Sequence, residues 1–222
     1  MKIKFKLSLM VIAILVAVAG GIAAILLTNA TKLARDLSMQ NLSNMVKTRT
    51  QYWQGREEAH IRSLHTIAAL MANYEDIPAE QRRDRFDDML RDALAAEPRW
   101  MRVFSIWKPN AIDGMDSRYI GRQGSTSTGQ YAMTYTREFG PIQFTPNQDL
   151  QNSMNYINGP NARLTRVDDP TTFELAGVMQ YVARLGSPII NPRTGEVVGI
   201  VTCVLDLTAT QETMMETVKN NP

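Results

Sequence analysis

The chain has 222 residues, enough for one domain with a well-developed core plus an attachment and too few for two large domains. Hydrophobic residues make up 44%, charged residues 21%, and the formal net charge is +2, so the composition is that of an ordinary globular protein and does not indicate nucleic-acid binding. The single cysteine, Cys203, excludes an internal disulfide and a multi-cysteine metal site, and its apolar surroundings predict a buried packing residue.

The first predicted element is a transmembrane helix at residues 7–27, a stretch without a charged residue. At the rise of an α-helix, about 20 apolar residues cross a hydrocarbon core about 30 Å thick. Three lysines within residues 1–6 precede this stretch, so the positive-inside rule predicts a cytoplasmic N-terminus and an extracytoplasmic location for the rest of the chain. A cleaved signal peptide is the alternative, because residues 17–19 resemble a small-residue cleavage site.

A long stalk helix is predicted next, at residues 28–75. From residue 30 to residue 74 the chain has no proline and a single glycine, Gly55, and its apolar residues recur at helical spacing. Such a helix is far longer than the mean of about 11 residues, so we expect a partner helix and a parallel homodimer. His60 and His65 lie about 140° apart on a helix, which predicts surface or packing histidines and no metal site.

A globular module is predicted at residues 76–207, followed by a C-terminal segment at 208–222. Pro78 begins its helix, which Pro98 ends, and the buried stripe is predicted at Phe86, Met89, Leu90, Ala93 and Leu94. Strands are predicted at 102–107, 131–139, 143–145, 173–185 and 196–206, and the turn formers at 191–195 make the last two an antiparallel hairpin. Helices followed by antiparallel strands predict an α+β fold with one central antiparallel sheet.

Between the first two strands, residues 107–137 contain too many turn formers for one regular element: Pro109, Asn110, Asp113, Gly114, Gly121, Gly124 and Gly129. Ordered loops of this length are uncommon unless they carry a function. The sequence therefore predicts a functional loop that a sheet displays as a binding surface.

The residue pattern does not indicate catalysis. Residues 124–129 read G-x-x-x-x-G, but Gln130 and Tyr131 stand where a phosphate-binding loop needs Lys and Ser or Thr. The aspartate pairs at 113/116 and 168/169 have no histidine or third carboxylate beside them, so they are interpreted as turn formers. Because no nucleophile–base arrangement is present either, we predict no enzyme activity and no cofactor.

Aromatic residues and an arginine on the predicted strands instead suggest a binding site. Even spacing places Tyr131, Tyr135 and Arg137 on one face of a regular strand. An arginine flanked by tyrosine rings can hold a carboxylate or other small anion between apolar walls. The alternative, that the tyrosines pack in the core and Arg137 is solvated, is equally compatible with the sequence.

At these residues the chain resembles the double Cache domain, the PAS-like extracytoplasmic sensory domain of bacterial methyl-accepting chemotaxis proteins. The motifs that carry the resemblance are WKPNAIDGMDSRYIG at 107–121, TGQYAMTYTR at 128–137, NYINGP at 155–160 and GSPIINPRTGEVVGIVTCVLDLTATQ at 186–211. The resemblance implies five or six antiparallel strands packed on the long helix, with a small-molecule pocket between the sheet and its crossing loops. Of the R-x-W-Y motif that many amino-acid-binding members carry, only Tyr156 is present.

The resemblance implies the ligand-sensing part of a chemoreceptor for chemotaxis signal transduction, held in the cell inner membrane by one span with its sensory domain in the periplasm. The expected ligand contacts are Tyr135, Arg137 and Tyr156, and the expected pocket walls are Trp107 and Tyr181. Tyr131 is expected on the same strand face as Tyr135 and Arg137, which encloses the pocket. No second module, second membrane helix or signalling helix follows Pro222, so we expect a fragment of a longer receptor or a truncated gene product.

The same sensor joined to a histidine kinase or a cyclic-dinucleotide enzyme is the first alternative. A membrane-anchored extracytoplasmic enzyme is a second, and the shortage of catalytic groups argues against it. A pilin-like structural subunit is a third, but residues 7–27 lack the early glutamate that such subunits usually carry.

Overall fold

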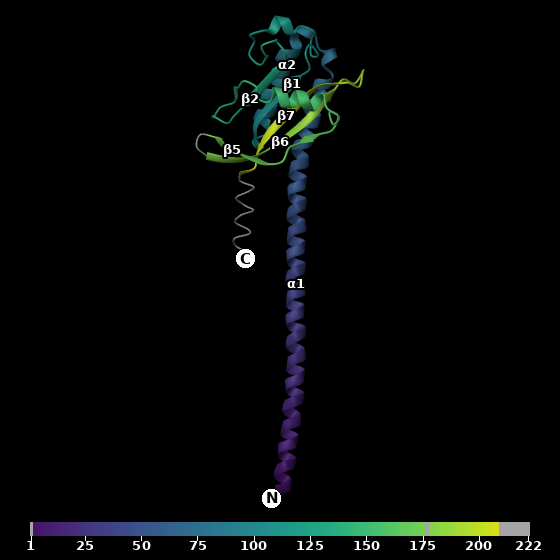
Figure 1. Ribbon diagram of the computed structural model, residues 1–222, viewed down its shortest axis with the longest axis vertical. Coiled ribbons are helices and arrows are strands. Elements are labelled where there is room, and N and C mark those ends of the chain that lie inside the picture. The colour runs from purple at the N-terminus through teal and green to yellow at the C-terminus, as the bar shows by residue number, and fades with distance from the viewer. Residues whose placement is uncertain (1, 176–177, 209–222) are drawn as a thin grey trace. The chain divides into compact units, whose positions relative to one another are not determined.

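The computed structural model describes residues 2–175 and 178–208, and it begins with one continuous helix, α1, at Lys2–Ala72 (Figure 1). The chain forms two compact units, Met1–Glu57 and Glu58–Pro222. Residues 58–72 of α1 therefore belong to the second unit, together with all the described strands. The predicted α+β class with a central antiparallel sheet is confirmed, whereas the predicted domain boundaries stay a prediction.

The first unit consists of the N-terminal part of α1. Its exposed side chains include Leu26, Leu33 and Leu37, whose spacing places them on one side of the helix. Within the described part of the chain, none of the helices is both long enough and apolar enough to cross a bilayer. The membrane span predicted at residues 7–27 stays a prediction.

The second unit opens with residues 58–72 of α1, the short 3-10 helices η1 (Tyr74–Asp76) and η2 (Ala79–Gln81), and helix α2 (Arg82–Ala96). The helix predicted after Pro78 is thus confirmed. Phe86, Leu90 and Leu94 are spaced by one turn each and are fully buried, which explains why this face of α2 covers the sheet. The helix ends at Ala96 because a proline disfavours helical backbone in the residue before it, here Glu97.

The described strands form one antiparallel sheet in the order β3-β2-β1-β7-β6-β4, and β5 pairs with β6 outside this path. Their bounds are Trp100–Trp107 for β1, Ala132–Thr136 for β2, Gln143–Phe144 for β3, Arg166–Val167 for β4, Thr171–Leu175 for β5, Val178–Ile190 for β6 and Val197–Asp206 for β7. Helix η3 (Asp116–Tyr119) lies in the β1–β2 connection, and α3 (Leu150–Ile157) follows β3.

Two predicted strands differ from the structure. The strand predicted at 131–139 ends at Thr136, where a turn closed by a hydrogen bond from the Gly140 amide to the Arg137 carbonyl (3.1 Å) turns the chain away. The strand predicted at 173–185 is a hairpin of β5 and β6, with Leu175 paired to Val178; residues 176–177 of that prediction lie outside the described part. Neither α3 nor β4 was predicted, because both are short segments.

The hairpin predicted between the last two strands is confirmed, since β6 and β7 pair antiparallel from Val182 opposite Asp206 to Ile190 opposite Val197. Asn191 shapes its turn: its side-chain oxygen accepts hydrogen bonds from the amides of Arg193 (2.8 Å) and Thr194 (3.2 Å). Its side-chain nitrogen donates to the Tyr74 hydroxyl at 2.8 Å. The hairpin is therefore fastened to η1.

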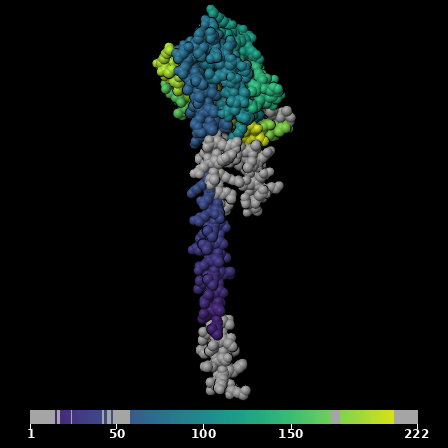
Figure 2. Space-filling model, turned by 180° about the vertical axis from the view of Figure 1, so that it is seen from behind, coloured from purple at the N-terminus to yellow at the C-terminus, as the bar shows by residue number. Residues whose placement is uncertain are grey.

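Each face of the sheet carries its own hydrophobic core, because neighbouring side chains of a strand point to opposite faces. From β1, Trp100, Val103 and Trp107 enter the helix-side core with α2 and residues 58–72 of α1, whereas Phe104 and Ile106 enter the α3-side core. Figure 2 shows the face of the second unit that α2 and the end of α1, drawn in blue, cover.

Two packing predictions concern single residues of this unit, and both are confirmed. Cys203 is fully buried in the helix-side core. His60 is buried, and its Nδ1 accepts a hydrogen bond from the Trp100 indole at 3.2 Å, while His65 is exposed. They are thus packing and surface histidines respectively.

Candidate ligand-binding site

The β1–β2 connection, residues 108–131, is the long loop that the turn formers predict. Its left-handed backbone positions are Asn110, Gly114, Gly121, Gly124 and Gly129. At Gly129, with φ of 83°, a Cβ atom would lie 1.8 Å from the carbonyl oxygen of Asp116. Only glycine fits this close approach, so the backbone at position 129 can lie directly against the backbone of Asp116.

Arg83 of α2 fastens the loop to the helix from inside the protein, where it is 1% exposed. Its guanidinium donates to both carboxylate oxygens of Asp113 (2.6 and 3.1 Å) and to Asp116 (2.6 Å). It also donates to the Gly129 carbonyl (2.7 Å) and to the Ser125 hydroxyl (3.3 Å). These bonds use all five donors of the arginine, and two of its partners are carboxylates, so the loop is held in one conformation.

A cavity of about 370 Å³ lies beside this loop and is called the loop pocket here. The loop forms one wall with residues 122–127, while β2, β3 and the start of α3 form the others. Its apolar lining residues are Ala132, Phe144, Pro146 and Leu150, and its polar ones are Arg122, Gln123, Ser125, Thr126, Ser127 and Asn147. Concave pockets of this size that combine apolar walls with polar groups are typical of small-molecule sites.

Arg122 is the charged residue among the lining residues of the loop pocket. Its Nη2 donates to Asp84 at 2.7 Å and to Asp87 at 2.6 Å, both on α2. The two carboxylates differ in environment, because the Asp84 side chain is 79% exposed and the Asp87 side chain only 13%. Arg122 therefore links the pocket to α2 through a largely buried ion pair with Asp87 and a solvated ion pair with Asp84.

Tyr131 holds Asp87 from the side of the core, donating its hydroxyl to Oδ1 at 2.8 Å. Burial raises the pKa of the Asp87 carboxyl above its usual value, and the Tyr131 hydrogen bond and the Arg122 charge offset part of that rise. Burial and the Asp87 charge raise the pKa of the Tyr131 hydroxyl well above its usual value, so Tyr131 remains a donor. Tyr131, Asp87 and Arg122 thus form a chain that runs from the core to the pocket.

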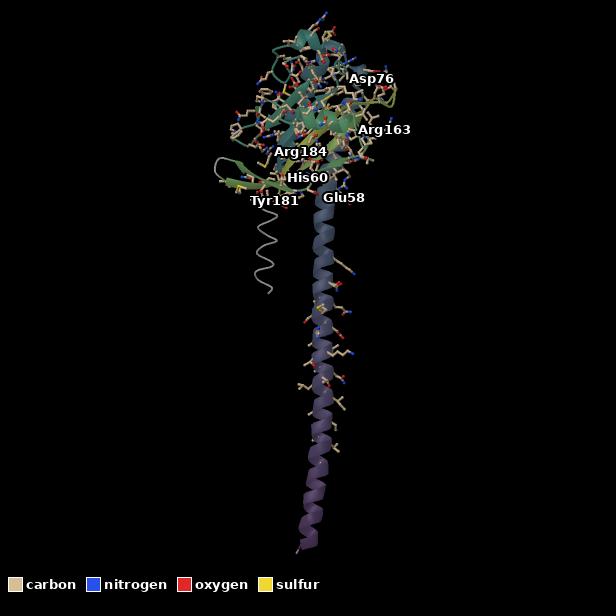
Figure 3. The ribbon with its side chains drawn as sticks, viewed as in Figure 1. Glu58, His60, Asp76, Arg163, Tyr181 and Arg184 are labelled. Atoms are coloured by element: carbon tan, nitrogen blue, oxygen red, sulfur yellow. The ribbon has the colours of Figure 1, made fainter. Side chains whose placement is uncertain are left out.

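A second polar cluster ties the start of α3 to β6 and β4, which lie toward the opposite edge of the sheet from β3. Asp149, just before α3, pairs with Arg184 of β6 at 3.1 Å and with Arg166 of β4 at 3.5 Å (Arg184 is labelled in Figure 3). Arg166 is held in turn by both oxygens of Asp168 at 2.8 Å. Both aspartate pairs that the sequence suggested as turn formers therefore contribute ion-paired residues.

Two of the predicted site residues, Trp107 and Tyr131, are fully buried in the helix-side core. The Trp107 ring stacks on Phe86, with 5.5 Å between centroids, and meets the edge of Tyr74 at 5.1 Å. Tyr135 lies on the same face as Tyr131, as the even spacing predicted, and packs half-buried against that core.

Of the other three, Tyr181 packs against the same helix-side core, whereas Arg137 and Tyr156 lie elsewhere. Arg137 follows the end of β2, and its Nη1 is 3.5 Å from the Pro98 carbonyl. Tyr156 lies on α3, on the opposite face of the sheet, and donates its hydroxyl to the Leu164 carbonyl. Tyr181 is half-buried on β6, where Figure 3 labels it.

The structure therefore does not gather the six predicted residues at one place, and none of them is a lining residue of the loop pocket. Whether any of them contacts a ligand stays a prediction. The sequence reasoning selected the right stretch, since residues 122–127 lie within 107–137, but it missed Arg122 and Asn147. An arginine two residues before the glycine- and hydroxyl-rich run GSTSTG at 124–129 is the signal that could have found Arg122.

No group of three or more His, Cys, Asp or Glu side chains in the described part of the chain is arranged to hold a metal ion. The arrangement of the loop pocket offers hydrogen-bond donors, one guanidinium and an apolar wall. Such a site can bind a small molecule and orient it.

No protein-family model and no curated protein matches the chain. Solved structures do match it. Two are extracellular domains of proteins described as histidine kinases: mmHK1S-Z2 has 24% identity and a TM-score of 0.56, and mmHK1S-Z3 has 22% identity and a TM-score of 0.60. A third is methyl-accepting chemotaxis protein X, with 17% identity and a TM-score of 0.52. The chain thus shares the fold of these domains.

The matches cover 68%, 71% and 67% of this chain and 56%, 55% and 54% of the three solved chains, in the same order. The chain therefore spans little more than half the length of the structures it matches.

Proposed function

We propose that this chain is the extracytoplasmic ligand-sensing part of a membrane-bound chemoreceptor, and that a small molecule binds in its loop pocket. The observation that carries the proposal is this pocket, which a loop clamped by Arg83 forms against an antiparallel sheet. The shared fold with extracellular sensory domains supports it. The proposed role is binding rather than catalysis, and the lack of a nucleophile–base pair among the lining residues supports it.

A second candidate is the sensor of a histidine kinase, or of a cyclic-dinucleotide enzyme that uses the same kind of sensor. The two solved domains from proteins described as histidine kinases favour the kinase version. Both candidates use the same pocket and differ in the output domain. The gene sequence downstream of the codon for Pro222 distinguishes them.

The sequence supports the membrane part of the proposal. The apolar stretch at 7–27 with three preceding lysines fits an inner-membrane anchor with the sensory unit on the periplasmic side. The exposed leucines at 26, 33 and 37 on one side of α1 fit a parallel homodimer in which two stalk helices pair.

The test is a thermal-shift screen of the full chain in detergent micelles against amino acids, carboxylates, amines and purines. A ligand present at 100 times its dissociation constant stabilises the folded state by about 2.7 kcal/mol, which raises the melting temperature by roughly 5–10 °C for a domain of this size. Calorimetry then measures the affinity of each hit.

Ser127→Trp places a large ring at an exposed lining position of the loop pocket and should abolish binding of a true ligand. Thr66→Trp, at an exposed position of α1, is the matched control and should bind normally. A hit that binds Ser127→Trp as tightly as the unmodified chain would place its site elsewhere, and a screen without any hit would contradict the proposal.

A further inference from the structure

We propose that the loop pocket selects a small monoanion, a carboxylate with a short apolar tail, and that the anion takes the place of Asp84 on Arg122. This inference rests on the proposed function, because it assigns the ligand chemistry of the same pocket. It follows from how Arg122 is positioned, from how weakly Asp84 is held, and from what lines the rest of the pocket.

Arg122 is prepared for an anion before any ligand arrives. Asp87 accepts a hydrogen bond from Arg122 Nη2 at 2.6 Å and another from the hydroxyl of the fully buried Tyr131 at 2.8 Å. These two bonds orient the guanidinium from the core outward. The Arg122 side chain is 23% exposed, and Arg122 is one of the residues that line the pocket. A charged group that is already oriented loses little side-chain entropy when a ligand binds it.

Asp84 is an exchangeable partner of this arginine. Asp84 accepts a hydrogen bond from the same Arg122 Nη2 at 2.7 Å, but its side chain is 79% exposed. Ion pairs between exposed groups contribute little binding free energy, because water screens them. A ligand carboxylate offers the two-oxygen geometry that matches a guanidinium, and it would be shielded by the pocket walls. Releasing Asp84 to solvent therefore costs less free energy than the shielded ion pair between the ligand and Arg122 provides.

The remaining lining residues limit the charge and shape of the ligand. No lysine and no second arginine lines the pocket in the described part of the chain, so a second negative charge would be unpaired. Phe144, Pro146 and Leu150 form an apolar wall that suits a hydrocarbon tail. A volume of about 370 Å³ accommodates a ligand of this size.

A cationic ligand is the competing possibility, because Asp84 and Asp87 together outnumber Arg122 in charge. The two possibilities predict opposite effects of one substitution. If an anion replaces Asp84, Asp84→Asn removes its competitor and strengthens binding; if a cation binds to Asp84, the same change weakens binding. This opposition makes the ligand class testable.

The experiment measures affinities by calorimetry on the full chain in detergent micelles, with butyrate and benzoate as anions and butyramide and benzamide as neutral isosteres. Butylamine and succinate serve as cationic and dianionic probes. We expect the monoanions to bind at least tenfold more tightly than their amides and than succinate. Arg122→Gln should remove this preference, Arg122→Lys should keep part of it, and Asp84→Asn should tighten anion binding two- to fivefold.

Two matched controls come from an ion pair on α2 that is remote from the pocket lining, Arg91 with Asp88. Arg91→Gln and Asp88→Asn should leave the affinities unchanged, and circular dichroism should show all variants folded. Equal binding of butyrate to Arg122→Gln and to the unmodified chain, or weaker binding by Asp84→Asn, overturns the inference. If butylamine or an amide binds tightly and Ser127→Trp blocks that binding, the inference is overturned but the proposed function stands. If neither the probes nor the screened compounds bind, the inference and the proposed function are both overturned.

Discussion

Replacing Arg83 by methionine tests whether this one buried side chain holds the β1–β2 loop in place. Methionine fills similar volume but leaves Asp113 and Asp116 without a counter-charge, and their side chains are 0% and 7% exposed. Removing one partner of a buried ion pair costs about 3–5 kcal/mol, because the remaining charge stays desolvated. For a domain of this size, that cost lowers the melting temperature by roughly 6–20 °C.

The assay combines thermal unfolding followed by circular dichroism with hydrogen exchange of residues 108–131. We expect amide exchange in this loop to accelerate, because the carbonyl of Gly129 and the hydroxyl of Ser125 lose their donor together with the aspartates. Arg85→Met is the matched control, since Arg85 is an exposed arginine of the same helix, and it should change stability by less than about 0.5 kcal/mol.

A triple variant sharpens the interpretation. Adding Asp113→Asn and Asp116→Asn to Arg83→Met removes the unpaired charges and should restore most of the lost stability, because the penalty arises from charges rather than from packing. If Arg83→Met alone has an unfolding free energy within about 1 kcal/mol of the unmodified chain, the buried ion pairs do not hold the loop, and the reasoning on the loop pocket loses its structural basis.

Three further predictions concern the core, the membrane and assembly. Tyr131→Phe should cost about 1–3 kcal/mol in stability, measured by urea unfolding, because Asp87 loses a buried donor; an unchanged midpoint would show that water replaces the hydroxyl. Alkaline phosphatase fused after Pro222 should be active and membrane-bound, whereas a soluble chain that begins near Gly20 would indicate cleavage. Leu37→Cys should form a disulfide-linked dimer in membranes under mild oxidation, while Arg35→Cys, about 200° around the helix, should not; equal crosslinking would argue against a defined stalk interface.

Much of the fold could be predicted because its signals are local. Helix α2 is marked by apolar residues at one-turn spacing between two prolines, and the β6–β7 hairpin by Asn191 and Gly195 between two apolar runs. The division of one predicted strand into β5 and β6 was missed, because both halves are apolar enough to resemble a single run. Helix α3 was missed because its role depends on residues far along the chain, such as Arg166 and Arg184, which pair with Asp149.

The candidate site was harder to predict because the same side chain can serve a core or a pocket. The even spacing correctly placed Tyr131 and Tyr135 on one face, but periodicity does not say which layer covers that face. The covering layer is α2, so Tyr131 donates to Asp87 inside the protein. Arg122 lies in a glycine-rich loop whose apolar residues show no periodic spacing. The contact with Asp87 that orients it comes from α2, 35 residues earlier in the sequence.

The proposed exchange of Asp84 for a ligand also predicts how affinity varies with tail length. A solvated ion pair contributes about 0–1 kcal/mol, whereas a charge-assisted hydrogen bond contributes about 1.5–3 kcal/mol, so the exchange adds roughly 1–2 kcal/mol, or about tenfold in affinity. That increment is too small for tight binding alone, so the wall of Phe144, Pro146 and Leu150 has to supply the rest.

Each methylene group that the wall buries adds about 0.8 kcal/mol, or roughly fourfold in affinity. Calorimetry should therefore show affinity rising from acetate through butyrate until the pocket is full, both for the carboxylates and for the corresponding amides. The ratio between each carboxylate and its amide should stay near tenfold along the series, because the charge contact and the apolar contact involve different residues. A ratio that falls toward one as the tail grows would show that long ligands bind without Arg122, and the assignment of the anion to this arginine would then be wrong.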